Sequence, residues 1–368
     1  MLTPEDRRFG ALITHLIAGR DLDRRQTREA FSGILQNTVT EMQQGAFLAA
    51  LAAKGETRAE VAGAWEAIYA LDTCKVRVPA GQPLVENSGT GMDTFKTFNI
   101  STAAAVVAAA GGIRMARHGA RAITSVCGTV DMAEALGVDV ECSAAQVAGS
   151  IEKAGIGLFN GMSPRIHPRA LGRILSQIGF GSTLNIAASL ANPALPSLGV
   201  RGVYSADMIR PVVEAMQAIG YRRALVCYGR IGRSGQGMDE ASVCGTTDCA
   251  ELLPDGGICQ FRLRPQDAGL AAHRPDDLVP AASIDVEARR LVALISGHEN
   301  GVRRDAVLLN AGLIFYVAGA APDISGGVRQ AAAAIDSGGA REVLTNWVQY
   351  QNTDPAVGLA KLAPLMRP

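Results

Sequence analysis

The chain has 368 residues with a hydrophobic content of 48%, and its 35 lysines and arginines balance its 35 aspartates and glutamates. Such a chain can bury a large core, whereas a net charge near zero argues against general nucleic-acid binding, which depends on clustered positive charge. No stretch reaches the roughly 18 apolar residues of a membrane span, and the charged N-terminus lacks the apolar core of a signal peptide, so we expect a cytoplasmic protein.

The seven cysteines are scattered along the chain, and none forms a C-x-x-C pair. Metal and disulfide sites usually show regular cysteine spacing. We therefore interpret these cysteines as small buried hydrophobic residues in a reducing compartment.

The N-terminal part reads as a small helical domain. Apolar residues recur at helical spacing over residues 4–74, as at Leu12 and Leu16, and no strand-like run interrupts them. Residues 76–83 contain two prolines and a glycine, which predicts a connection to the next domain.

A glycine-rich turn then lies between a short strand and a buried helix. Apolar residues 83–85 end in polar residues, and residues 103–110, all alanine or valine, read as a helix that opens at 99–102. The first turn of a helix presents unpaired N–H groups and the positive end of the helix dipole. This arrangement favours the binding of an anion.

The turn itself contains Gly89, Gly91 and Asp93. The two glycines allow the backbone to approach a ligand closely. A site that binds only phosphate does not need a carboxylate. The Asp93 carboxylate therefore indicates that the site also binds Mg²⁺ or a sugar hydroxyl. Taken alone, the same residues are equally consistent with an ordinary turn.

Beyond this turn, short apolar runs such as Ala224–Tyr228 alternate with helical stretches such as Val212–Ile219 and Ala331–Ile335. This alternation predicts an α/β domain with a mostly parallel sheet covered by helices.

Several short motifs follow one another in a fixed order. They are Gly89-Thr90-Gly91-x-Asp93, Asn99-x-Ser101-Thr102, Arg117-His118-Gly119, Gly128-Thr129-Val130-Asp131, Asn192-Pro193, Gly202-Val203-Tyr204-Ser205 and Met238-Asp239-Glu240. This series resembles the signature of the anthranilate phosphoribosyltransferase family, and the resemblance covers the chain up to about Asn346.

The resemblance implies a nucleoside phosphorylase/phosphoribosyltransferase-like fold. Residues 1–75, with a return segment near 165–190, would form a helical dimerisation domain, and residues 76–368 would form the α/β catalytic domain. We therefore expect a homodimer through the helical domains.

The resemblance also implies transfer of ribose 5-phosphate from phosphoribosyl pyrophosphate (PRPP) to a nitrogen atom. The leaving pyrophosphate needs Mg²⁺ and N–H dipoles to stabilise its charge. Because Mg²⁺ is held by a few protein oxygens plus substrate phosphates, we expect Ser101, Asp239 and Glu240 to be the metal-associated residues.

The residues expected to bind PRPP are Gly89, Thr90, Gly91, Asp93, Asn99, Ser101, Thr102, Arg117 and Thr129. Asp93, Arg117 and His118 are the expected catalytic residues. Arg117 stands where the family has lysine, so its charge is kept in a different geometry. Thr129 keeps a hydroxyl where serine is usual, and it is equally suited to cap a helix.

The expected acceptor pocket departs from the family. Ala120 replaces an asparagine that contacts the aromatic acceptor, and Leu175, counted back from Gly179, replaces an arginine that holds the anthranilate carboxylate. His167 and Arg173 complete the pocket. A buried carboxylate without a partner costs several kcal/mol, so the predicted acceptor is an aromatic or heteroaromatic nitrogen compound other than anthranilate.

Three arginines are possible replacements for the missing cation, and a solvated arginine face is the alternative interpretation: Arg165, Arg169 and Arg173. The register over residues 158–185 stays open because two segments differ from the family in length. Met92, in place of a glycine, and Ala188-Ser189, in place of Gly-Pro, also change the walls of the site. The loop over 228–237 is longer than usual, and it is either an anion-binding lid or a tolerated insertion.

Two other functional classes stay open. One is a genuine anthranilate phosphoribosyltransferase of tryptophan biosynthesis with a substituted pocket. The other is a non-catalytic relative that binds nucleic acid or a protein partner, although the net charge and the Asp239-Glu240 pair argue against it. A nucleoside phosphorylase fits the motifs less closely. We expect PRPP and a small aromatic acceptor as partners, and no nucleic acid or membrane.

Overall fold

The computed structural model describes residues 3–79, 81–122, 127–232 and 234–367. Four helices open the chain: α1 (Pro4–Ile17), α2 (Arg24–Leu35), α3 (Glu41–Lys54) and α4 (Arg58–Leu71). Each follows a threonine or aspartate whose side chain accepts the N–H of the residue three positions later. This hydrogen bond satisfies one of the free N–H groups at a helix start. The helices predicted from the spacing of apolar residues are confirmed.

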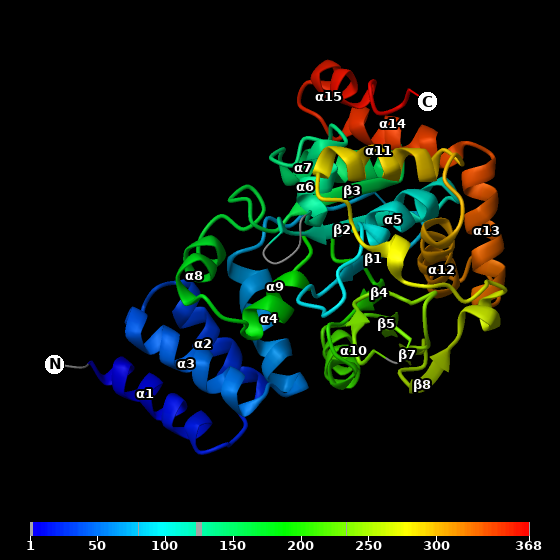
Figure 1. Ribbon diagram of the computed structural model, residues 1–368. Coiled ribbons are helices and arrows are strands. Elements are labelled where there is room, and N and C mark those ends of the chain that lie inside the picture. The colour runs from blue at the N-terminus through cyan, green and yellow to red at the C-terminus, as the bar shows by residue number, and fades with distance from the viewer. Residues whose placement is uncertain (1–2, 80, 123–126, 233, 368) are drawn as a thin grey trace.

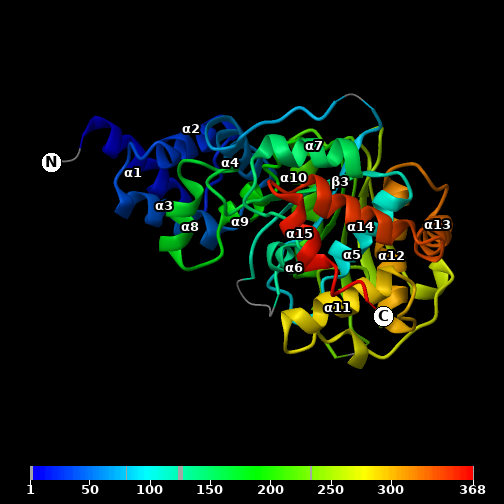
Figure 2. The same cartoon turned by 90° about the horizontal axis from the view of Figure 1, so that it is seen from above.

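Two later helices, α8 (Leu171–Ile178) and α9 (Thr183–Ser189), pack onto these four. One hydrophobic cluster joins Phe31 and Phe47 of the N-terminal helices to Leu171 and Leu184 of the later pair. Figures 1 and 2 show this group of six helices at one end of the molecule, with the N-terminus on its outer side. We call this group the helical lobe.

An eight-stranded sheet forms the centre of the other end. Its strands are β1 (Leu84–Gly89), β2 (Arg114–Gly119), β3 (Ile156–Asn160), β4 (Leu198–Gly202), β5 (Arg223–Arg230), β6 (Gly237–Met238), β7 (Thr247–Leu252) and β8 (Ile258–Leu263). The order is β3-β2-β1-β4-β5-β7-β8, with β6 beside β5. The first five strands along this order are parallel and the rest are antiparallel, so the predicted mostly parallel sheet is confirmed.

Helices cover both faces of the sheet. One face packs against a group that contains α5 (Ile100–Ala110), α12 (Val302–Val317), α13 (Ile324–Asp336) and α14 (Gly339–Tyr350). The opposite face packs against α7 (Ala144–Ala154) and α10 (Ile209–Ala218). The remaining helices are α6 (Thr129–Ala135), α11 (Ile284–Ile295), α15 (Pro355–Leu362) and three short 3₁₀ turns, η1 (Ala206–Met208), η2 (Pro265–Ala268) and η3 (Asp276–Leu278).

The two faces of β1 and β2 carry different polar side chains toward the ends of these strands. Successive side chains of a strand point to opposite faces. Val85 and Met115 pack in the same cluster as α5, whereas Ala116 packs in the cluster with α7. Asn87 and Arg117 therefore lie on the α5 face, and His118 lies on the opposite face.

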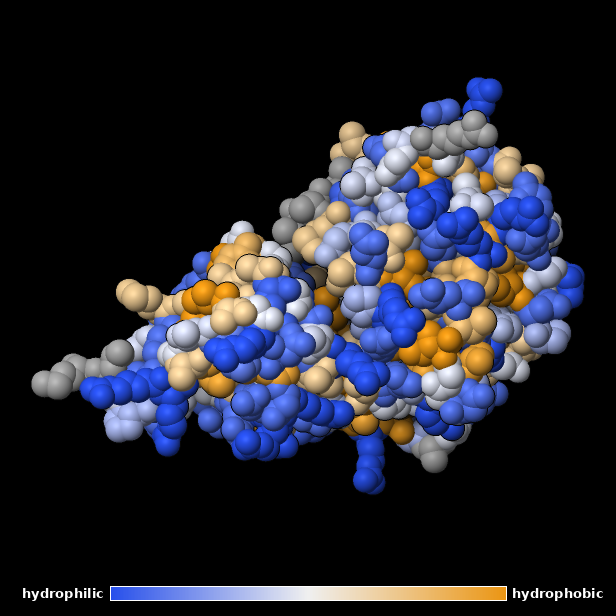
Figure 3. Space-filling view, turned by 90° about the horizontal axis from the view of Figure 1, so that it is seen from below, coloured by the Kyte–Doolittle hydropathy of each residue, from blue (hydrophilic) through white to orange (hydrophobic). Residues whose placement is uncertain are grey.

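The side of the molecule drawn in Figure 3 has a mixed exterior of polar and apolar residues. Figure 3 shows hydrophilic residues over much of one side of the molecule, with hydrophobic residues in separate patches. Among the described residues, no helix combines the length and the apolar character that a membrane crossing requires.

Candidate active site

The glycine-rich turn joins β1 to α5 and lies directly against Asp239. The Gly91 N–H donates to Asp239 Oδ2 at 2.7 Å, and the Thr90 N–H donates to the Gly202 carbonyl oxygen at 3.1 Å. A Cβ atom on Gly89 would lie 2.0 Å from Asp239 Oδ2, which no real contact allows. The glycine at position 89 is therefore required for this close approach.

The turn takes left-handed backbone conformations at two successive residues. Gly91 has φ of 68° and Met92 has φ of 62°. Glycine adopts this region freely, but a residue with a side chain is strained there. The Met92 side chain is 45% exposed, so it leaves the turn rather than crowding it.

Three carboxylates gather beside this turn. Asp93 comes from the turn itself, and Asp239 and Glu240 follow β6. One oxygen of each carboxylate lies within 4.8 Å of the others, and all three residues are at least nine-tenths buried. Sequence reasoning selected all three residues, and the structure brings them together.

The carboxylate cluster carries more negative charge than its surroundings offset. Burial, and then the charge of Asp93, raises the pKa of Asp239 to about 6. Burial and the two neighbouring carboxylates raise the pKa of Glu240 well above its ordinary value. Within the described residues, the only ion pair of the cluster joins Lys96 Nζ to Asp93 Oδ1 at 2.7 Å. This set of oxygen ligands fits a hard divalent cation such as Mg²⁺.

The start of α5 lies beside the cluster and is supported by Arg117. The Asn99 side chain precedes the helix but makes no capping hydrogen bond, since its amide donates instead to the carbonyl oxygens of Cys127 and Gly128 at 3.3 and 3.2 Å. The α5 N-terminus therefore has no side-chain cap to compete with an anion.

Arg117 is 1% exposed and holds the first turn of α5 from behind. Its Nη1 donates to Thr102 Oγ1 at 2.9 Å, its Nη2 to Ser101 Oγ at 3.4 Å, and its Nε to Asn87 Oδ1 at 3.0 Å. Burial lowers the pKa of Arg117 to about 10, so the guanidinium stays charged at neutral pH. The hydroxyls of Ser101 and Thr102 thus connect the positively charged guanidinium to the start of α5.

Thr129 is the first residue of α6, and Gly128 occupies the cap position. The interpretation of Thr129 as a helix cap was therefore wrong. Asp131 takes the capping role, because its Oδ2 accepts the N–H groups of Ala122 and Gly128 at 2.8 and 3.0 Å. The Thr129 hydroxyl makes no hydrogen bond to the described part of the chain.

His118 and His167 form a buried pair on the opposite face of the sheet. Their Nε2 atoms lie 3.2 Å apart, and each residue is 5% exposed. His118 Nδ1 contacts the Ser189 carbonyl oxygen at 3.2 Å, and His167 Nδ1 contacts the Asp72 carbonyl oxygen at 2.6 Å. These contacts connect the sheet to α9 and to the end of α4.

Burial is the main cause that lowers the pKa of both histidines. Desolvation, followed by the charges of His167 and Arg201, lowers the pKa of His118 to about 3 despite the hydrogen bond to Ser189. Burial also lowers the pKa of His167.

The other residues predicted for the acceptor pocket are spread out. Ala120 is half-buried, and Leu175 is half-buried against the core of the helical lobe. Arg173 donates to Gln44 Oε1 at 3.2 Å and to the Ile34 carbonyl oxygen at 3.1 Å, so its guanidinium is held within that lobe. Arg165 and Arg169 are exposed. None of the three arginines is buried beside His118.

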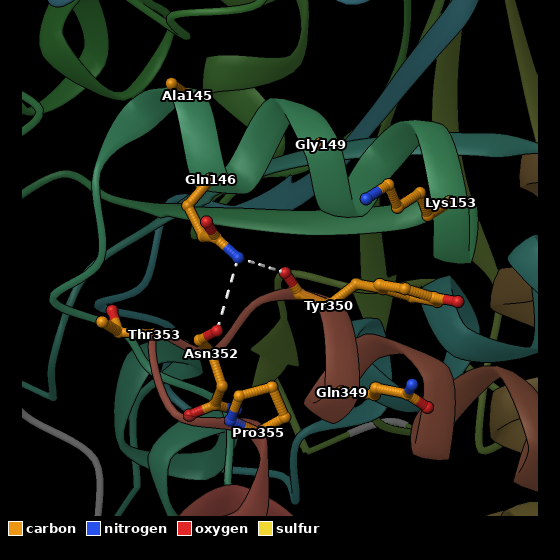
Figure 4. Close-up of a pocket in the computed structure, with 9 residues that line it drawn as sticks. All are labelled: Ala145, Gln146, Gly149, Lys153, Gln349, Tyr350, Asn352, Thr353 and Pro355. Carbon is orange, nitrogen blue, oxygen red and sulfur yellow. Dashed lines mark hydrogen bonds between the residues drawn. The ribbon is translucent and has the colours of Figure 1, made fainter.

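Two further features concern residues outside the predicted PRPP and acceptor sets. The segment over 228–237, predicted as one long loop, instead begins with the last residues of β5 and ends with the first residue of β6. Its Arg230 pairs with Asp248 through Nη2 and Oδ2 at 2.6 Å, and its Gly237 N–H donates to Thr94 Oγ1 at 3.0 Å, beside Asp93. Residue 233 lies outside the described ranges. A cavity of about 350 Å³ lies between α7 and the α14–α15 segment, where Gln146 Nε2 donates to the Tyr350 carbonyl oxygen at 2.7 Å (Figure 4). No residue that lines this cavity belongs to the predicted site.

Sequence reasoning missed three residues that complete the arrangement. Lys96 follows Asp93 by three residues, a spacing that brings both side chains together. Arg201 is a charged residue within the apolar run of β4, which is a signal in itself. Asp72 accepts the N–H groups of residues 169–171, and nothing in the local sequence indicates this distant contact.

Comparison with known proteins gives a consistent result. Residues 81–341 match the model of a glycosyl transferase family, a/b domain, and residues 11–71 match its helical bundle domain. The anthranilate phosphoribosyltransferase of Rubrobacter xylanophilus is 38% identical over 332 residues, which cover 90% of this chain and 94% of the relative. The chain belongs to the anthranilate phosphoribosyltransferase family. It is thus a phosphoribosyltransferase family member, as the motifs predicted.

Further members of the family agree with this assignment. The anthranilate phosphoribosyltransferase of Myxococcus xanthus is 37% identical over 91% of this chain and 96% of its own length. The crystal structure of the Thermus thermophilus enzyme has a TM-score of 0.82 at 31% identity, covering 92% of this chain and 99% of that one. The Saccharomyces cerevisiae enzyme, solved in complex with PRPP and Mg, has a TM-score of 0.81 at 22% identity, over 94% and 98% of the two chains, and it supports the fold.

Proposed function

We propose that this chain transfers ribose 5-phosphate from PRPP to the nitrogen of anthranilate in a Mg²⁺-dependent reaction. One observation carries the PRPP half of this proposal: three buried carboxylates with a single ammonium partner lie beside the uncapped start of α5. A divalent cation and a polyphosphate together complement that arrangement. Family membership and the yeast relative with PRPP and Mg support it.

Each part of the site has a proposed role toward PRPP. Asp93, Asp239 and Glu240 would hold the metal, and Ser101 is a weaker metal candidate because its Oγ already faces the Arg117 guanidinium. The backbone of Gly89, Thr90 and Gly91 would approach the pyrophosphate. The proposed phosphate contacts also include Asn99, Ser101, Thr102 and Thr129. Arg117 would add positive charge from behind the start of α5.

The reaction breaks the bond between the anomeric carbon and the pyrophosphate oxygen, and it forms a bond from that carbon to nitrogen. Mg²⁺, when bound, supplies positive charge to the departing pyrophosphate. The N–H groups at the start of α5 and the charge of Arg117 add to this stabilisation at fixed positions, so they need no reorganisation during the reaction.

His118 acts as a positioning group for the acceptor in this proposal. A general base works best when its pKa lies near the operating pH, and burial holds the pKa of His118 at about 3. Its partners Ser189 and His167 fix the orientation of the ring. The proton of the amine therefore leaves to solvent or to another group.

The test is calorimetric titration of PRPP into the purified protein with and without Mg²⁺, followed by turnover with anthranilate. The wild-type chain should bind PRPP only with Mg²⁺, and an Asp239→Asn/Glu240→Gln variant should lose this binding. An Asp285→Asn/Glu152→Gln variant removes two exposed carboxylates elsewhere and should bind as the wild type does. Metal-independent binding, or equal binding by both variants, contradicts the proposal.

A second candidate function keeps PRPP and changes the acceptor. Ala120 and Leu175 are apolar at the two positions where the resemblance predicts polar contacts to the acceptor, which favours another aromatic or heteroaromatic nitrogen compound. The curated relatives support anthranilate instead, so we place this candidate second. Parallel assays with anthranilate and a panel of aromatic amines decide between them, since the better acceptor has the higher kcat/KM.

We also propose that residues 1–75, with 165–190, form a dimerisation domain and that residues 76–368 form the PRPP-binding domain. Support comes from the exposed hydrophobic side chains of the helical lobe, where Met42 is 86% exposed and Phe180 is 42% exposed. Sedimentation of the wild type beside a Met42→Glu variant tests this arrangement. A wild-type monomer at micromolar concentration contradicts it.

A further inference from the structure

A buried arginine lies within β4, where every residue is buried. Arg201 is 1% exposed and pairs in register with Ser88, the next-to-last residue of β1. Its guanidinium donates from Nη1 to Ser88 Oγ at 3.1 Å and from Nη2 to Ser189 Oγ. Two hydroxyls therefore receive the hydrogen bonds of this charge.

The charge of Arg201 is poorly compensated. Its nearest carboxylate is that of Glu86, at 4.0 Å between Nη1 and Oε1, and the other oxygen of Glu86 accepts from the Tyr221 hydroxyl at 2.7 Å. Arg201 Nε and Glu86 Oε1 are both buried without a hydrogen-bond partner among the described residues. A purely structural ion pair at such depth needs close contact and satisfied atoms, whereas this pair lacks close contact and leaves one atom of each residue unsatisfied.

Arg201 lies between the PRPP residues and the histidine pair. The next residue, Gly202, accepts the Thr90 N–H, and a Cβ there would overlap the Asp239 carbonyl oxygen. On its other side, Ser189 connects Arg201 to His118, because the Ser189 carbonyl contacts the His118 ring. The Arg201 guanidinium thus lies between the residues proposed to bind PRPP and His118.

The two serines reach farther toward the surface than the arginine does. Ser88 and Ser189 are half-buried, whereas Arg201 is fully buried. The Ser189 hydroxyl donates to the Ile186 carbonyl oxygen at 2.7 Å. Ser88 Oγ accepts from Arg201, and among the described residues its own proton has no acceptor. That proton is left to donate to a ligand.

We propose that Arg201 and Ser88 recognise the carboxylate of the acceptor. Arg201 is a positioning residue, since it orients the Ser88 hydroxyl and places a positive charge behind it. This assignment gives the chain a cation on the His118 side of the sheet. Leu175 carries no charge, and none of Arg165, Arg169 and Arg173 is buried beside His118. It rests on the proposed function, because it takes an aromatic amine with a carboxylate as the acceptor.

The experiment compares the binding of anthranilate with that of its neutral carboxamide, in the presence of Mg²⁺ and pyrophosphate, which allow no turnover. The variants are Ser88→Ala and Arg201→Lys, which keeps the charge but loses the fork that spans both serines. We expect each to weaken anthranilate binding by about tenfold, which corresponds to about 1.4 kcal/mol, and to change carboxamide binding by less than about threefold. Arg210→Met, which removes an exposed arginine of α10, is the control.

Folding is checked separately, because loss of a buried charge can unfold a chain. A Glu86→Gln/Arg201→Met variant removes both buried charges and keeps the site neutral, and its melting temperature and PRPP affinity are measured beside the binding of both acceptors. Selective loss of anthranilate in this folded variant supports the inference. Equal loss of both acceptors, or unchanged anthranilate binding, overturns it.

The same data separate this inference from the proposed function. Wild-type protein that binds Mg²⁺ and PRPP but does not turn over anthranilate contradicts the proposed acceptor. If that protein still binds anthranilate as an inhibitor through Arg201, the carboxylate assignment stands. If the wild type binds neither anthranilate nor benzoate, the assignment is overturned.

Discussion

Met92 holds a backbone conformation that glycine adopts easily and other residues rarely do. Its φ of 62° costs about 1 kcal/mol for a residue with a side chain, and Met92→Gly removes this strain but adds a similar entropy to the unfolded chain. We expect Met92→Gly to change the free energy of unfolding by less than about 1 kcal/mol. Met92→Val should cost about 1–2 kcal/mol because a β-branched residue is more strained there.

Urea unfolding of both variants measures this difference. Met162→Val is the matched control, since Met162 is similarly exposed at 43% and lies outside the positive-φ positions. A Met92→Val variant as stable as the wild type would show that the turn relaxes to another conformation.

His118 makes the stability of the protein depend on pH. Its folded pKa of about 3 lies below the ordinary value of 6.5, so between these values the unfolded chain binds a proton that the folded chain does not. The contribution of this group to stability is therefore fully present above pH 6.5 and is lost as the pH falls toward 3. The slope is at most about 1.4 kcal/mol per pH unit for one proton.

Urea unfolding at several pH values between 7 and 4 measures this slope. His118→Gln should flatten the decline relative to the wild type, and His298→Gln, which changes an exposed histidine, should not. A decline of equal slope in all three proteins contradicts the expectation.

At the scale of elements, Asp72 fixes the start of α8 to the end of α4. Its carboxylate accepts the N–H groups of Arg169, Ala170 and Leu171 at 2.6, 2.9 and 2.8 Å, and the residue is fully buried. Asp72→Ala leaves these N–H groups without their acceptor, so we expect a loss of about 3 kcal/mol or more in the free energy of unfolding.

The matched control is Asp354→Ala, which removes an exposed cap at the start of α15 and should cost only about 1 kcal/mol. Limited proteolysis gives a second measurement, since detachment of α8 should expose residues 165–190 to cleavage. Equal stability losses in the two variants would mean that Asp72 is an ordinary cap.

The same contact shows why the sequence predicts some elements and not others. The N-terminal helices, the helix after the glycine-rich turn and the strand around Ala224 follow from local spacing and capping residues. Asp72 and Arg169 are separated by 97 residues, and a contact at that separation leaves no local pattern. Arg201 is similar, because its partners Ser88 and Ser189 come from a neighbouring strand and from the helical lobe.

For the whole molecule, the fold gathers site residues from distant parts of the chain. β1 and β4 end beside each other, which brings Gly89 next to Gly202, and the segment after β6 adds Asp239. The motifs identified each of these residues separately. The parallel pairing explains why they form one site, whereas the register of 158–185 needed the structure because α8 and α9 pack in the other lobe.

Ligand binding and folding are opposed at the carboxylate cluster. Burial and neighbouring charges raise the pKa of Glu240, so the ionised form destabilises the ligand-free protein. Glu240→Gln removes one of the repelling charges, and we expect it to raise the ligand-free stability. The wild type gains stability from Mg²⁺ and PRPP by mass action, about 2.7 kcal/mol at a ligand concentration 100 times the dissociation constant.

Thermal unfolding should therefore rank the wild type and the Glu240→Gln variant in opposite orders of melting temperature with and without Mg²⁺ and PRPP. Without ligand the Glu240→Gln variant should melt above the wild type, and with ligand the order should reverse, because the variant lacks a carboxylate that the metal needs. The exposed substitution Glu152→Gln should follow the wild type in both conditions. A variant that melts below the wild type without ligand would show that Glu240 is stabilised by contacts rather than destabilised by repulsion, and a variant that keeps the full ligand shift would remove Glu240 from the metal site.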